Sequence, residues 1–218
     1  MTNRVLEAED MNTKVPGNWW LGFPTMADLV PEGRAGNTKV EHYEVSVHDV
    51  MFASMKGGNG WTDPNRTYTK LIVDGTLATS DTAMERESHW EVAHEARGNV
   101  YIGGLGLGMI VHAIIKLPDV TAITIIEKSE EVVDLVQPTL PNGKPVTVVH
   151  ADVFDWGPER GVKYDTIYFD IWNYLCVDNL DQISQLKRHL GAHKAKGVWC
   201  RGWQEDWLRY LKRADRWH

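Results

Sequence analysis

The 218-residue sequence contains little cysteine. Its two cysteines, Cys176 and Cys200, are too few for a disulfide scaffold, and they do not form the CxxC spacing of common zinc and redox motifs. A reduced, cytoplasmic location is the default expectation for such a chain. No stretch approaches the roughly 18 consecutive apolar residues of a membrane span. The polar first residues do not predict a signal peptide, so we expect no membrane partner.

Basic residues are also in deficit. The chain carries 23 Lys and Arg against 30 Asp and Glu, a formal net charge of -7. A protein that coats nucleic acids needs a basic surface, so general nucleic-acid binding is not expected, although one basic groove stays compatible with this charge. The length suits one ordinary domain, or one domain with a small appendage.

The first third of the chain is expected to form a small β-rich module. The segment "KVEHYEVSV" alternates apolar and polar residues, as a half-buried strand does. The segment "TYTKLIVDG" predicts a second strand that ends in a turn at Asp74 and Gly75. We therefore expect an N-terminal module at residues 1–75 and a second domain at residues 76–218.

The segment "SDTAMERESHWEVAHEA" predicts one helix, with Ser80 or Asp81 as its N-cap and Gly98 as its stop. Glu85 and His89 are four residues apart on this helix. No third metal ligand stands out for them or for the other such pair, a pair of histidines near residue 190, and we predict no metal site.

From residue 99 the pattern changes to alternating strands and helices. Strands are expected at residues 99–104, 122–127, 146–152, 164–172 and 196–200, and helices at residues 108–117, 129–138 and 180–191. Such alternation is typical of an α/β fold with a doubly wound parallel sheet. Ligands of these folds bind at the carboxyl ends of the strands.

Four glycines follow the first of these strands, in "VYIGGLGLGMIVHAII". Gly103, Gly104, Gly106 and Gly108 would let the backbone turn sharply and lie against a ligand. The alternative is tight packing between strand and helix. Met109 stands where the third glycine of a dinucleotide motif would be, and no G-x-x-x-x-G-K-[ST] motif occurs, so nicotinamide and NTPase loops are disfavoured.

Carboxylates follow the next strands. Glu127 ends residues 122–127, where it could accept hydrogen bonds from both ribose hydroxyls of a nucleoside. Asp152 follows the third strand and could accept an adenine amino proton, or cap the next helix instead. Asp170 ends the fourth strand and precedes Trp172 and Tyr174. Because these side chains share one sheet edge, the sequence predicts a nucleoside-binding site.

These motifs resemble the class I S-adenosylmethionine-dependent methyltransferase fold, in its spermidine-synthase-like branch, over about residues 71–203. The pattern is also similar to small uncharacterised methyltransferase-like proteins of bacteriophages and bacteria. The resemblance implies a Rossmann-like sheet and S-adenosylmethionine as the cofactor. The residues that it assigns to the cofactor are Gly103, Gly104, Gly106, Gly108, Glu127, Lys128, Asp152, Val153 and Asp170.

Asp81 and Glu85 lie on a segment that could fold over the methionine end of the cofactor, so Asp81 is a further candidate contact. The alternative is a solvated helix N-terminus.

A methyltransferase with an unidentified acceptor is the leading hypothesis. Asp170 would orient or deprotonate the nucleophile, and Trp172 and Tyr174 would wall the acceptor pocket or, alternatively, pack the sheet edge. Aminopropyltransferases carry a D-[ST]-[ST]-D segment where this chain has Asp170-Ile171-Trp172-Asn173. Base-methylating enzymes carry a [DNS]-P-P-[FYW] segment, and both prolines are absent here. An aminopropyltransferase that uses the decarboxylated cofactor and a non-catalytic binding protein stay open as alternatives.

The class I fold usually ends with an antiparallel hairpin. Here the residues after the last predicted strand, "RGWQEDWLRYLKRADRWH", instead predict a short amphipathic helix. The edge of the sheet would then be exposed, and exposed edges are usually covered or paired. We expect a homodimer, or a covering element from the N-terminal module.

Overall fold

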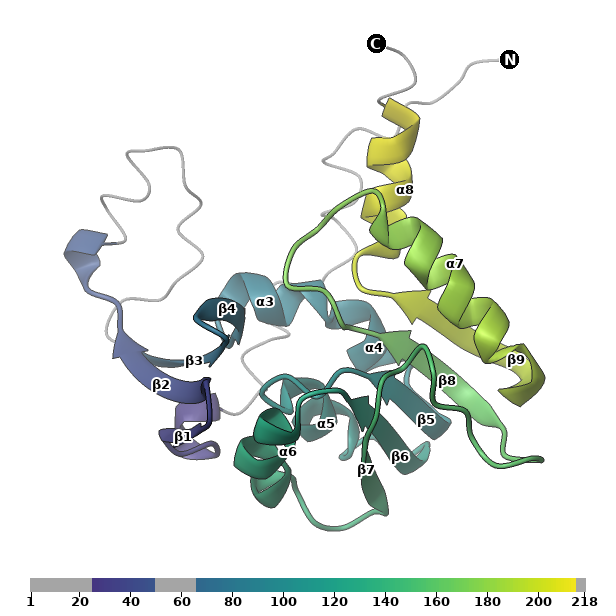
Figure 1. Ribbon diagram of the computed structural model, residues 1–218, viewed down its shortest axis with the longest axis horizontal. Helices are drawn as coiled ribbons and strands as arrows, with labels where there is room; N and C mark the ends of the chain where they lie inside the picture. Colours follow the sequence, from purple (N-terminus) through teal and green to yellow (C-terminus); the bar gives the residue numbers. More distant parts are fainter. Residues whose placement is uncertain (1–24, 50–65, 215–218) are drawn as a thin grey trace.

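The computed structural model describes residues 25–49 and 66–214. Its N-terminal part forms an antiparallel sheet that lies beside the larger α/β part (Figure 1). The elements of the first part are η2 (Met26–Asp28), β1 (Gly33–Ala35), β2 (Thr38–Glu44), β3 (Thr67–Val73) and β4 (Thr76–Ser80). The elements of the second part are α3 (Ala83–Ser88), α4 (Trp90–Glu95), β5 (Gly98–Gly103), α5 (Met109–Ile114), β6 (Val120–Glu127), α6 (Glu130–Val136), η3 (Gln137–Thr139), β7 (Val146–His150), β8 (Tyr164–Phe169), α7 (Asn179–His189), η4 (Gly191–His193), β9 (Lys194–Gly202) and α8 (Glu205–Ala214).

The larger sheet has the strand order β7-β6-β5-β8-β9, and every neighbouring pair is parallel. The predicted α/β fold with a Rossmann-like parallel sheet is therefore confirmed. The strand order reverses at β5, because β6 lies on one side of it and β8 on the other. A reversal of this kind opens a crevice at the carboxyl ends of the strands, where ligands of open α/β sheets bind.

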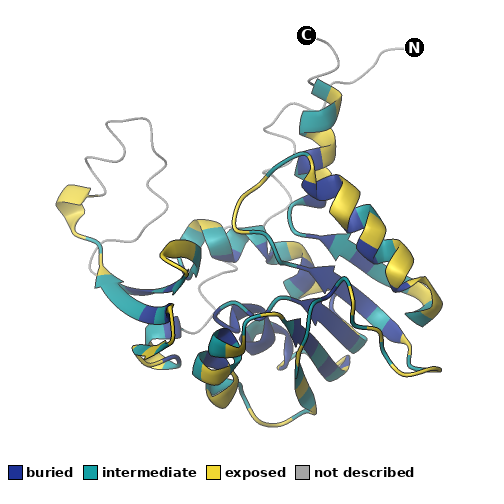
Figure 2. Cartoon of the chain, in the orientation of Figure 1, coloured by how far each residue is buried: buried dark blue, intermediate teal, exposed yellow. Residues whose placement is uncertain are grey.

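Apolar side chains fill both faces of this sheet, which is why its strands are nearly continuous apolar runs. Val100 and Ile102 of β5 belong to one buried cluster, whereas Tyr101, between them, belongs to another. The first cluster includes residues of α4, α5 and α6, and the second includes Leu186 of α7. Figure 2 shows the strands as the buried centre and α7 with an exposed outer side.

The antiparallel sheet has the order β1-β2-β3-β4. Because β4 pairs with β3, this sheet continues to Ser80, past the boundary that the sequence suggested at Gly75. Val40 of β2 and Leu71 of β3 belong to the same buried cluster as the core of the larger sheet. The two sheets therefore share a core. Residues 1–24 and 50–65 of the expected N-terminal module lie outside the described residues.

The predicted single helix before β5 is in fact two helices. α3 ends at Ser88 and α4 begins at Trp90, and His89 between them has a φ of -99° and a ψ of 8°, outside the helical region. Gly98 does not stop a helix but opens β5 with a φ of 61°. A helix pattern in the sequence did not reveal this break, because no proline or glycine marks it.

At the other end of the sheet, β9 pairs only with β8 among the described strands. α8 follows β9, in agreement with the amphipathic helix predicted there. Within residues 25–49 and 66–214, no strand hairpin and no element of the antiparallel sheet pairs with the outer edge of β9. The homodimer stays a prediction. A search of the described helices finds none long and apolar enough to cross a bilayer.

Candidate functional site

The glycine-rich loop joins the ends of three strands. The amide of Gly104 donates a hydrogen bond to the carbonyl oxygen of Ile126 in β6 at 2.8 Å. The amide of Asp170 donates one to the carbonyl oxygen of Gly103 at 2.7 Å. Gly104, Gly106 and Gly108 have φ values of 96°, 52° and 73°, a backbone region that residues with a side chain rarely adopt. The loop is therefore held tightly between β6 and β8.

Different surroundings explain why each of the four positions holds a glycine. A side chain on Gly103 would press on Val153 and Phe169, and one on Gly108 would lie 2.8 Å from Leu140. The packing alternative thus accounts for these two, which are not among the cavity-lining residues. Gly104 and Gly106 do line the cavity at the carboxyl edge of the sheet.

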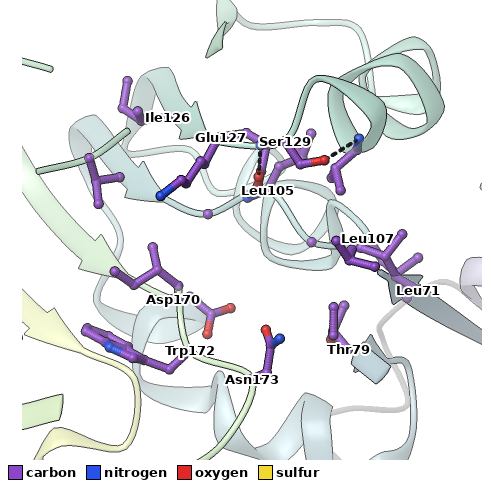
Figure 3. A pocket seen from close by; sticks show the side chains of 18 of the residues that line it. Leu71, Thr79, Leu105, Leu107, Ile126, Glu127, Ser129, Asp170, Trp172 and Asn173 are labelled. Carbon is purple, nitrogen blue, oxygen red and sulfur yellow. Dashed lines mark hydrogen bonds between the residues drawn. The ribbon is translucent and has the colours of Figure 1, made fainter. Parts of the chain in front are cut away.

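This cavity has a volume of about 940 Å³. One part is walled by the glycine loop and the ends of β6 and β7, and another by the β3–β4 hairpin and the segment between β8 and α7. Figure 3 shows Glu127 and Ser129 on the first side, and Asp170, Asn173 and Thr79 around the second. Both sheets therefore build the site.

Glu127 stands at the end of β6, as predicted, and lines the cavity. One of its carboxylate oxygens accepts a hydrogen bond from the amide of Leu105, and the other accepts one from the amide of Ser129, both at 2.8 Å. The carboxylate thus ties the glycine loop to the start of α6. Each oxygen keeps a further lone pair for a ligand.

Asp152 and Lys128 form an ion pair across the ends of neighbouring strands, with a distance of 2.8 Å. The hydrogen bond from Lys128, together with the amide of Phe154, lowers the pKa of Asp152. Asp152 is therefore a carboxylate at neutral pH. Both residues line the cavity, as do Val153 and Phe154, which follow Asp152.

Asp170 follows β8 and lines the cavity with about a quarter of its side chain exposed. Burial, and then the negative charges of Glu85 and Glu127, raise the pKa of Asp170 well above its ordinary value. His89 lies behind it, with its Nε2 atom 3.6 Å from Oδ2 of Asp170. Burial lowers the pKa of His89 to about 3, so its ring is neutral. The pair thus offers a basic carboxyl group beside an uncharged imidazole.

Trp172 and Tyr174 also line the cavity. The indole Nε1 of Trp172 donates a hydrogen bond to Gln182 of α7, which fixes the ring against that helix. Tyr174 is 72% exposed, so its ring stands at the mouth of the cavity. Its backbone carbonyl accepts a hydrogen bond from Asn179 at the start of α7.

Asp81 is not among the residues that line the cavity. Its side chain is fully buried, which also rules out a solvated helix N-terminus. It accepts hydrogen bonds from the amides of Thr69 and Met26, and its Oδ2 lies 3.0 Å from the guanidinium of Arg86. The structure therefore gives Asp81 a place in the packing of the antiparallel sheet, not at the site. Glu85, one turn on, does line the cavity.

Several lining residues were not predicted as site residues from the sequence. The sequence suggested Glu85 only as part of a segment that could fold over the cofactor or as half of a metal pair with His89, and it did not point to Phe154. Leu71 and Thr79 come from the β3–β4 hairpin, whose chemistry the sequence did not reveal. Contacts between two separate sheets leave no local spacing signal, so no motif could have found them. In the described part of the chain no three His, Cys, Asp or Glu side chains gather as a metal site would require.

Neither a family model nor a curated protein matches the sequence. Solved structures do resemble parts of the fold. The plantazolicin methyltransferase BpumL in complex with SAH is 18% identical, with a TM-score of 0.35 over 50% of this chain and 39% of that chain. The N-methyltransferase NodS from Bradyrhizobium japonicum is 14% identical, with a TM-score of 0.39 over 51% and 62%. Spermidine synthase from Thermotoga maritima is 17% identical, with a TM-score of 0.39 over 65% and 47%.

The matched part spans less than two thirds of each of these three chains. At such identities and TM-scores the likeness concerns part of the fold alone. The residues of the cavity must therefore carry any argument about function.

Proposed function

We propose that this protein is an S-adenosylmethionine-dependent methyltransferase that acts on a small molecule. The observation that carries the proposal is the placement of three carboxyl groups. Glu127, Asp152 and Asp170 lie at the carboxyl ends of three different strands of the parallel sheet and line one cavity beside the glycine loop. This arrangement suits a nucleoside with a charged tail at the carboxyl edge of a Rossmann-like sheet.

The residues present fit this cofactor. Gly104 and Gly106 leave the backbone bare along the cavity. Glu127 has lone pairs left for ribose hydroxyls, and Asp152 has them for an adenine amino group. Val153 and Phe154 offer apolar surface next to Asp152. When bound, the cofactor supplies a methyl group on a positively charged sulfur, which makes that carbon an electrophile.

The charge of the cavity supports both a cationic cofactor and a small acceptor. Among the described lining residues, seven are aspartates or glutamates and a single one is a lysine, Lys128, which is paired with Asp152. Such a cavity attracts a sulfonium cation and repels a polyanion. A neutral or cationic small molecule therefore fits it better than a nucleic acid.

The acceptor would lie between Asp170 and the β3–β4 hairpin. Leu71 and Ala78 offer apolar contact there, while Asn173 and Thr79 offer hydrogen bonds. Figure 3 shows the side chains of Asp170 and Asn173 directed toward this space. Asp170 would orient the nucleophile or accept its proton, and the hairpin would select the acceptor by shape.

The test is methyl transfer from S-adenosylmethionine that carries a ¹³C-labelled methyl group, incubated with a small-molecule extract and, separately, with nucleic acid. We expect labelled product and S-adenosylhomocysteine with the extract only. Asp170→Ala should abolish turnover and leave cofactor binding largely intact.

Other results would change the proposal in defined ways. Preference for decarboxylated S-adenosylmethionine, with an aminopropylated amine as product, would make the protein an aminopropyltransferase. Binding of the parent cofactor without turnover on any fraction would favour a non-catalytic binding protein. Product from nucleic acid would overturn the small-molecule acceptor.

A further inference from the structure

We propose that His89 is a positioning residue for Asp170, held in one tautomer by Tyr168, so that one carboxyl oxygen of Asp170 is fixed and the other is left for the proton of the acceptor. The inference rests on the proposed function. It concerns three residues from two separate parts of the chain, the α3–α4 junction and β8.

The backbone of His89 lies at the break between α3 and α4. His89 lies between Ser88 of α3 and Trp90 of α4, and its φ of -99° and ψ of 8° lie in the bridge region, where many active-site residues are found. Its amide still donates to the carbonyl oxygen of Arg86 at 3.2 Å. The residue is 2% exposed and lines the cavity behind Asp170.

Tyr168 contacts the other side of the imidazole. Its hydroxyl lies 3.2 Å from Nδ1 of His89, and the two rings meet edge to face at 6.1 Å. The tyrosine is 3% exposed and is itself stacked on Trp199 of β9. When the hydroxyl donates to Nδ1, the ring carries its hydrogen on Nε2, the atom that faces Asp170.

His89 then donates from Nε2 toward Oδ2 of Asp170. The separation of 3.6 Å is longer than a hydrogen bond. Contacts of catalytic groups are often long before a ligand is bound and tighten in the complex. Asp170 lines the cavity, and we assign its second oxygen to the acceptor. The proton of an acceptor N–H or O–H passes to this oxygen, and the electron pair of that bond remains on the acceptor nitrogen or oxygen.

Other ionisable groups surround the pair. Besides burial, the negative charges of Glu85 in α3 and Glu127 in β6 raise the pKa of Asp170. Besides burial, those of Glu91 in α4 and of Glu85 also raise the pKa of Tyr168. All of these are carboxyl groups, and burial also raises the pKa of Glu85 and of Glu91. These carboxyl groups disfavour the charged form of Asp170. An N–H donated by His89 is the contact that stabilises it.

The test is a titration of the Asp170 carboxyl by ¹³C NMR in the full chain without cofactor. Loss of the N–H donor should raise the pKa of Asp170 by about 0.5 to 1 unit, the scale of one hydrogen bond. We expect this rise in His89→Phe, and partial restoration in His89→Gln, whose amide can donate from a similar position. Tyr168→Phe keeps the ring and removes only the hydroxyl, so it should also raise the pKa and shift the ¹⁵N signals of His89 away from the Nε2–H tautomer.

Asp152→Asn is the matched control, because it removes a cavity carboxyl that is paired with Lys128 and does not touch His89. It should leave the His89 signals unchanged. The proposal is overturned if folded Tyr168→Phe and His89→Phe both titrate at Asp170 as the wild type does, or if His89 carries its hydrogen on Nδ1. Calorimetric titration with S-adenosylmethionine runs in parallel. If the wild type does not bind S-adenosylmethionine, the result counts against the proposed function. The carboxyl titration tests the positioning role of His89 separately.

Discussion

The carbonyl oxygen of Asp170 occupies the space where a side chain on Gly104 would begin. A Cβ atom at Gly104 would overlap this oxygen and lie 2.9 Å from the carbonyl carbon. The glycine loop and the end of β8 therefore touch through bare backbone, and this contact sets the position of Asp170 at the cavity. The sequence predicted a ligand beside this glycine, with tight packing between strand and helix as the alternative, and the structure shows that Gly104 packs against the end of β8.

The contact predicts the effect of Gly104→Ala. The substitution combines an unfavourable φ of 96° with a clash against backbone, which cannot move as a flexible side chain can. We expect a loss of about 2 to 4 kcal/mol in the free energy of unfolding, measured by urea denaturation.

Two other glycines serve as controls for that variant. Gly75 has a φ of 77° with no atom within 4 Å of a Cβ, so Gly75→Ala should cost only the backbone term of about 1 to 2 kcal/mol. Gly191 has open space and an ordinary φ, so Gly191→Ala should be close to neutral. Equal losses at Gly104 and Gly75 would show that the backbone contact with Asp170 does not matter.

The raised pKa of Asp170 predicts a stability that depends on pH. As the pH rises above the ordinary value of 3.8, the unfolded chain releases the Asp170 proton at a lower pH than the folded protein does, which opens a pH window between the two ionisations. The folded state then binds more protons, so stability falls as the pH rises through this window. The asparagine side chain in Asp170→Asn does not titrate, so this variant does not lose stability in this pH window.

We therefore expect Asp170→Asn to be more stable than the wild type at pH 7 and similar to it at pH 4, in thermal unfolding at both values. A site that sacrifices stability for function behaves in this way. If the variant instead loses stability relative to the wild type between pH 4 and pH 7, folding lowers the pKa of Asp170 and the account of this residue is wrong.

The buried ion pair of Asp81 and Arg86 predicts a structural effect without a direct effect on the site. Both side chains are at most 1% exposed, and Asp81 also holds the amides of Met26 and Thr69. Asp81→Asn should cost about 3 to 5 kcal/mol, because it leaves a buried guanidinium without its carboxylate.

The control for Asp81 is Glu41→Gln in the same sheet. Glu41 pairs with Lys39 and Lys70 at the surface, and such pairs contribute less than about 1 kcal/mol. Affinity for S-adenosylmethionine, measured below the unfolding temperature, should be unchanged in both variants. A specific loss of affinity in folded Asp81→Asn would instead support the role at the cofactor that the sequence suggested.

The sequence predicted the parallel sheet and its carboxyl edge, because buried strands and their end residues are local patterns. The positions of Glu127 and Asp170 at this edge were predicted in this way, and their roles toward a cofactor stay predictions. His89 was not predicted as a lining residue, since its position depends on a helix break that no proline or glycine marks and on a tyrosine 79 residues away. The sequence suggested Asp81 as a cofactor contact. Its hydrogen-bond partners Met26 and Thr69 lie far from it along the chain, so no spacing of residues in the sequence predicts them. The β3–β4 hairpin entered the site for the same reason, through contacts between separate parts of the chain.

The most direct test of the account is calorimetric titration of the full chain and of Glu127→Ala with S-adenosylmethionine. The exposed neighbour Glu130, which does not line the cavity, gives the matched control Glu130→Ala. We predict saturable binding by the wild type and by Glu130→Ala, and an affinity about 10- to 100-fold lower in Glu127→Ala, the effect of losing hydrogen bonds to a charged group. Thermal unfolding confirms that the variant is folded, since Glu127 also binds the amides of Leu105 and Ser129. No binding by the wild type, or equal affinity in folded Glu127→Ala, would contradict the account.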